Sequence, residues 1–94
     1  MNKTQNLLVC LIEECSEVQK AATKALRFGL DNEYEDYCAP RKVLNAELID
    51  LVAIIEMLED NGVIESIYQR DLLQLKKAKV NKYMKYSCAH GQLV

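Results

Sequence analysis

The feature that most constrains this chain is the segment 41–60, which is apolar around nearly its whole circumference when read as a helix. Its leucine, isoleucine and valine residues recur at spacings of three and four, and Pro40 precedes it where a first-turn proline belongs. Asn61 and Gly62 follow it as helix-ending residues. A helix that is apolar on nearly all sides must be buried on nearly all sides, so the segment predicts a core helix.

Two further helices are expected, one on each side of this segment. The first covers about residues 4–28, with Thr4 as its N-cap and Gly29 as the residue that ends it. Its expected inward face is Leu8, Leu11, Cys15, Val18, Ala22 and Leu26. The second covers about residues 69–87 and combines an apolar stripe with a lysine-rich opposite face. The acidic stretch 30–39 has no helical period and is expected to be a loop.

The predicted fold is therefore all-α, with three main helices in a single domain, 1–94. Three glycines and one proline leave little turn material for a many-stranded sheet. Three helices of this kind cannot cover the apolar segment 41–60 by themselves. We expect a homodimer in which helices of two subunits pair into a four-helix bundle, or a homotetramer made of two such dimers.

Charge, hydropathy and cysteine spacing limit the classes of partner that the chain is expected to bind and the compartment in which it is expected to act. A net charge of −2 argues against binding to nucleic acid polymers, which requires a basic surface. The uncharged runs fall far short of the roughly 18–20 residues that span a bilayer, so no membrane partner is expected. The four cysteines form no CxxC pair, and the N-terminus does not read as a signal peptide. We expect free, buried thiols in a reducing cytoplasm.

Two pairs of acidic residues interrupt the apolar pattern. Glu14 and Glu17 stand three apart in the first helix, and Glu47 and Asp50 stand three apart in the second, so each pair shares a helix face. Such a pair alone is often a solvated face, but a buried, unpaired carboxylate costs several kcal/mol. Divalent metal is the simplest compensation. Carboxylates without imidazole suit Mg²⁺, with Mn²⁺ as a substitute, and the single histidine, His90, excludes a ferritin-like site.

The acidic pairs resemble the two halves of an EExxE…ExxD signature, as EECSE at 13–17 and ELID at 47–50. That signature belongs to the MazG-like all-α nucleoside triphosphate pyrophosphohydrolases, relatives of the dimeric dUTPases. Three further stretches are similar to small phage and bacterial members: LI at 11–12, KALRFG at 24–29 and KVNKY at 79–83. The resemblance spans about residues 5–87, nearly the whole chain.

The resemblance implies cleavage of a nucleoside triphosphate into a monophosphate and pyrophosphate, in the cytoplasm (the host cytoplasm for a phage protein). It implies Mg²⁺ ligands at Glu14, Glu17, Glu47 and Asp50. Glu13 points about 100° away around the helix and is expected beside the ligands or on the surface. The candidate substrate-binding residues are Lys79, Lys82, Lys24, Arg27 and Asn6.

Base recognition is where this chain departs from its larger relatives, which use aromatic side chains and often tryptophan. The chain has no Trp and one Phe. Tyr34 and Tyr37, in the loop 30–39, are the expected replacement, and a purine nucleotide such as (d)GTP is the expected substrate.

Two other functions fit the same sequence. A non-catalytic helical interaction module would keep the bundle and use the acids for partner contact. A dUTPase-like or nucleoside-diphosphate-hydrolysing enzyme would use the same metal site on another substrate.

Overall fold

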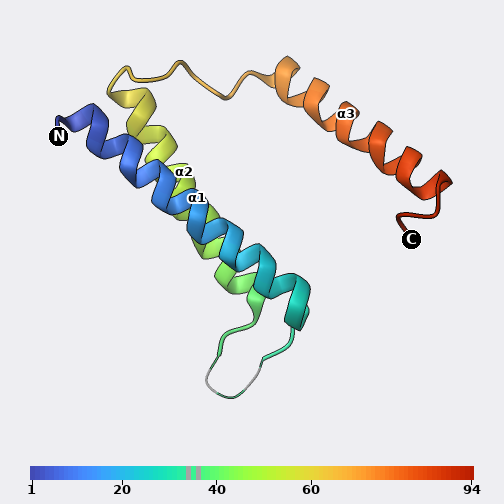
Figure 1. Ribbon diagram of the computed structural model, residues 1–94. Coiled ribbons are helices and arrows are strands. Elements are labelled where there is room, and N and C mark those ends of the chain that lie inside the picture. Colours follow the sequence, from blue (N-terminus) through green and yellow to red (C-terminus); the bar gives the residue numbers. More distant parts are fainter. Residues whose placement is uncertain (34, 36) are drawn as a thin grey trace.

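The computed structural model describes residues 1–33, 35 and 37–94, which form three α-helices and no β-strand (Figure 1). The helices are α1 (Lys3–Phe28), α2 (Pro40–Asp60) and α3 (Arg70–Ala89). The all-α prediction with three main helices is confirmed. α1 and α2 lie side by side as an antiparallel hairpin, whereas α3 runs apart from them after a long irregular link (Figure 1).

The ends of the helices follow from local chemistry. α1 begins with a capping box: the Asn2 side chain accepts from the Gln5 backbone N–H at 2.8 Å, and the Gln5 side chain accepts from the Asn2 N–H at 2.9 Å. The prediction of Thr4 as N-cap is therefore wrong, because this reciprocal pair satisfies two backbone donors with Asn2, two residues earlier, as the N-cap. Gly29 ends α1 at a φ of 83°, as predicted, and Pro40 occupies the first turn of α2.

The α1–α2 hairpin is held by a seam with alternating spacings of four and three, the pattern of an antiparallel coiled coil. On α1 the seam consists of Leu7, Leu11, Glu14, Val18, Ala21 and Ala25. On α2 it consists of Pro40, Leu44, Glu47, Leu51, Ile54 and Leu58. Leu58 is the most buried side chain, at 1% exposure, and Leu7 and Ala21 are also buried.

This seam corrects the predicted inward face of α1. Leu11 and Val18 do face α2, but the remaining inward positions are shifted by one residue, and Leu8 and Leu26 are exposed. The sequence carries two adjacent apolar stripes on α1. The structure places α2 against the stripe that contains Ala21, which is buried, and Ala25, which is half-buried.

The single chain does not bury α2 on all sides, and the burial of α2 by a second chain stays a prediction. α1 covers only one stripe, and Ile49 on the opposite side of α2 is 60% exposed. The cysteines also differ from expectation: all four are free, as predicted, but Cys15, Cys38 and Cys88 are exposed and only Cys10 is half-buried. Within the described residues, no helix has the length and hydropathy that crossing a membrane requires.

The loop between the first two helices is clamped to the start of α2. The Arg41 guanidinium donates to both carboxylate oxygens of Asp31, from Nε at 2.6 Å and from Nη2 at 3.0 Å, and its backbone N–H donates to the Leu30 carbonyl at 2.8 Å. The hydrogen bond from Arg41 lowers the pKa of Asp31 below its usual 3.8. A bidentate pair of this kind fixes orientation as well as distance.

We expect the Asp31 carboxyl to titrate below pH 3.8 in the wild type and to move back towards that value in Arg41→Gln. Because the folded-state pKa is lowered, the pair stabilises the fold above pH 3.8 and is lost as the pH falls through the lowered pKa. NMR titration of the side-chain carbons measures this directly. Lys42→Gln is the matched control, since Lys42 pairs with Glu33 at 3.7 Å, and an equal shift in both variants would contradict the assignment.

Candidate metal centre

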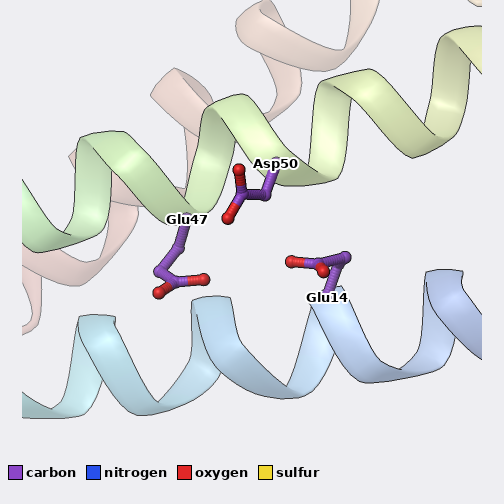
Figure 2. Close-up of side chains that lie close together, drawn as sticks. All are labelled: Glu14, Glu47 and Asp50. Carbon is purple, nitrogen blue, oxygen red and sulfur yellow. The ribbon is translucent and has the colours of Figure 1, made fainter.

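Three carboxylates meet between α1 and α2. Glu14 from α1 and Glu47 and Asp50 from α2 each offer an oxygen, and these oxygens lie within 4.8 Å of one another. Figure 2 shows the three side chains directed into the space between the two helices. The structure thus brings together three of the four predicted metal ligands from two helices.

The position of these acids follows from the seam. Along the α1 side of the seam, Glu14 comes between Leu11 and Val18. Along the α2 side, Glu47 comes between Leu44 and Leu51. Both are half-buried. Asp50 stands three residues after Glu47, so it shares its side of α2 but lies at the exposed edge of the seam. Acids at two core positions of a coiled-coil seam differ from an ordinary solvated pair.

The cluster carries concentrated negative charge. Burial raises the pKa of Glu14 above its usual 4.5, and the neighbouring charges of Asp50, Glu47, Glu17 and Glu13 raise it further. The ion pairs among the described residues join Lys20 to Glu17, Arg41 to Asp31 and Lys42 to Glu33, and none includes a member of the cluster. In the described part of the chain, no lysine or arginine therefore forms an ion pair with the three acids.

The fourth predicted ligand, Glu17, lies outside this cluster. Its side chain is exposed and pairs with Lys20 one turn along α1, with 3.4 Å between Nζ and Oε1. The influence of Glu17 on the pKa of Glu14 nevertheless places it near the cluster. Glu13 is exposed beside Glu14, as predicted for a residue that points away from the ligands.

The candidate substrate-binding residues are more scattered. Lys24 and Arg27 are exposed near the end of α1, and the Arg27 guanidinium lies 5.3 Å from the centre of the Phe28 ring. Asn6 is exposed in the first turn, two turns before Glu14. None of these side chains is a member of the acid cluster, and their predicted contacts with substrate stay predictions.

The structure does not bring Lys79 and Lys82 to the acids within one chain. Both are exposed on α3, and no Cα of α3 lies within 8 Å of a Cα of α1 or α2, helices whose residues are all described. Lys79 instead lines an open hollow of about 390 Å³ between α3 and the C-terminal tail, together with Tyr83 and Leu93.

The predicted base-recognition tyrosines have different outcomes. Tyr37 is 72% exposed in the loop, so its ring is free to contact a ligand. Tyr34 lies outside the described residues. Sequence reasoning missed the clamp between Asp31 and Arg41 that anchors this loop, because ten residues separate the partners and no periodicity links a loop to the helix that follows it.

No protein-family profile, curated protein or solved structure matches this chain. The resemblance to MazG-like enzymes therefore rests on the quoted motifs alone.

Proposed function

We propose that this protein is a Mg²⁺-dependent nucleoside triphosphate pyrophosphohydrolase, which converts a (d)NTP and water into a (d)NMP and pyrophosphate. The observation that carries the proposal is the meeting of Glu14, Glu47 and Asp50 across the α1–α2 seam. The resemblance of residues 13–17 and 47–50 to the EExxE…ExxD signature names the reaction.

The donor set fits magnesium. Mg²⁺ binds oxygen ligands at about 2.0–2.1 Å, so two oxygens on one ion lie no more than about 4.2 Å apart. The oxygens of Glu14, Glu47 and Asp50 already lie within 4.8 Å, so ordinary side-chain movement brings them to that spacing. These three residues would hold the metal, and Glu17 would complete the set after release from Lys20. Bound Mg²⁺ would offset the triphosphate charge and lower the pKa of the attacking water.

The chain's own residues then have distinct tasks. Without a cation, the acid cluster repels a triphosphate, which restricts productive binding to the metal-loaded protein. The hydrolysis itself joins a water oxygen to the α-phosphorus and breaks the bond between that phosphorus and the bridging oxygen to the β-phosphate. Pyrophosphate leaves with the bridging oxygen. Lysine and arginine side chains that contact the phosphates, with Lys79, Lys82, Lys24 and Arg27 as candidates, would stabilise the charge on the leaving group.

The loop between α1 and α2 is proposed to recognise the base of the nucleotide. Its anchorage through Arg41 and Asp31 keeps it next to the start of α2, one to two turns before Glu47. Tyr37 offers an exposed aromatic face for stacking on a purine. The expected preference for (d)GTP remains part of this proposal.

The proposed enzyme is a homodimer with a four-helix-bundle core. One side of the hairpin supports this: Leu8, Leu26 and Leu48 are 41%, 88% and 41% exposed, and helical spacing places them on the side away from Asp50. Pairing two such sides removes leucine side chains from water and leaves the acid-bearing side of each hairpin outside this interface. A dimer of these dimers remains the larger alternative.

A pyrophosphate-release assay with eight (d)NTPs, run with Mg²⁺ and again with EDTA, tests the proposed reaction. The expected result is release in Mg²⁺ only, strongest with a guanine nucleotide. Orthophosphate release would favour the diphosphate-hydrolysing alternative, and exclusive activity on dUTP would favour a dUTPase-like enzyme. No turnover of any nucleotide by the folded oligomer would contradict the proposal and favour the interaction module.

A further inference from the structure

α3 has an apolar stripe that neither α1 nor α2 of the same chain covers. Leu73, Val80 and Met84 follow one another at helical spacing and are each 44–48% exposed, and no residue of α3 is buried. An isolated amphipathic helix of this length is marginal in water, because packing of its apolar face supplies most of its stability. α3 therefore needs a surface to pack against.

The link between α2 and α3 directs α3 away from its own hairpin. Gly62 turns the chain at a φ of 69°, and the Val63 N–H donates to the Leu58 carbonyl at 2.9 Å. Further along, the Ile67 N–H donates to the Glu59 carboxylate at 3.1 Å. These bonds hold the link against the end of α2, and α3 leaves from there without returning to α1 or α2 (Figure 1).

The single chain is too open for a folded protein of its size. Its accessible surface is 7875 Å², whereas a compact monomer of this mass exposes about 5,500 Å². Its radius of gyration is 16.8 Å, against about 12.4 Å for a compact domain of this length. The excess is about 2,300 Å² per chain. If two chains bury this excess against each other, the total buried area of about 4,600 Å² falls within the roughly 2,000–5,000 Å² that obligate dimers bury.

Charge separates the two parts of the chain. α3 holds six of the twelve Lys and Arg residues and one acidic residue, which gives it a net charge of +5. The rest of the chain has six basic and thirteen acidic residues, a net charge of −7. Glu13, Glu17 and Asp50 lie by helical spacing on one side of the hairpin, where Met57 adds an exposed apolar side chain. That side complements α3 in both charge and hydropathy.

We propose that α3 of each chain packs against the acid-bearing side of the α1–α2 hairpin in a second copy of the chain. The apolar stripe through Val80 then meets the hairpin, and the flanking lysines lie beside its acids. Two α3 helices exchanged in this way cover both hairpins symmetrically, as a closed dimer requires. The exchange does not depend on the proposed reaction. If that reaction is correct, Lys79, at the edge of the stripe, serves the metal centre of the partner copy, whereas Lys82 lies on the opposite face of α3.

A mixed-isotope cross-linking experiment tests the exchange. Unlabelled and ¹⁵N-labelled full-length chains are combined in urea, refolded together and treated with a carbodiimide, which joins lysines to carboxylates in direct contact. Peptides that link α3 to α1 or α2 are then sorted by mass. Exchange predicts that about half of these peptides combine one labelled and one unlabelled partner. Links confined to equally labelled partners, or no links between α3 and the hairpin, would overturn the proposal.

Sedimentation equilibrium of two matched variants supplies a second test. Val80→Asp places a charge in the α3 stripe, whereas Ala78→Asp places the same charge on the opposite face of α3. We expect a wild-type dimer, a dimer affinity that Val80→Asp lowers more than tenfold, and a change of less than about threefold in Ala78→Asp. A wild-type monomer at micromolar concentration, or equal effects of the two variants, would overturn the exchange. Neither measurement uses catalytic activity, so an inactive protein that still exchanges α3 refutes only the proposed reaction.

Discussion

Replacing Glu47 with Gln and Asp50 with Asn together is expected to reduce nucleotide hydrolysis at least about 10³-fold, without loss of helical structure. The changes keep the size of both side chains but remove the charges that would hold Mg²⁺. They also relieve repulsion with Glu14, whose pKa is raised by burial and by both residues. The metal-free variant should therefore be at least as stable as the wild type near pH 7.

The matched control for this variant is Glu56→Gln with Asp60→Asn, which makes the same changes on the same helix at exposed positions. Pyrophosphate release and urea unfolding, followed by circular dichroism, are measured for both. The control should keep wild-type activity. Loss of helicity in Glu47→Gln/Asp50→Asn would mean that the acids are structural partners, and the assignment of the metal centre would be wrong.

Leu58→Ala is expected to lower the free energy of unfolding by about 2–5 kcal/mol, because it removes most of a fully buried side chain from the seam and leaves a cavity. Leu58 is 1% exposed, and its backbone carbonyl accepts a hydrogen bond from the Val63 N–H. Urea unfolding at a single protein concentration gives the value. Ile49→Ala on the outward side of α2 is the control, with a smaller loss, and a loss below about 1 kcal/mol for Leu58→Ala would contradict the described core.

Local sequence signals predicted the elements of the fold well. Gly29 and Pro40 act within one turn of the backbone, so the end of α1 and the start of α2 followed from the residue types alone. The choice between the two apolar stripes of α1 could not be predicted, since it depends on which stripe fits α2. The same limit applies to α3: its helix follows from periodicity, but the surface that covers it does not.

The candidate site was predictable for the same reason that the helices were. Glu47 and Asp50 stand in an apolar helix, where an ionised side chain is costly unless something compensates its charge. Glu14 could be predicted as their partner because the first helix carries an acidic pair with the same spacing. Glu17 shows the limit of spacing, because its exposed side chain pairs with Lys20 instead. The position of Lys79 relative to the acids depends on how α3 packs within and between chains. The periodicity of the sequence does not determine that packing.

The most direct test of the central claim is ³¹P NMR of the best nucleotide substrate during hydrolysis in ¹⁸O-labelled water, with Mg²⁺ and then with EDTA. The proposed reaction predicts a monophosphate that carries ¹⁸O on its α-phosphorus, unlabelled pyrophosphate, and no reaction in EDTA. Label in the pyrophosphate, formation of a nucleoside diphosphate and orthophosphate, or turnover in EDTA would contradict a metal-dependent attack on the α-phosphorus at the Glu14–Glu47–Asp50 cluster.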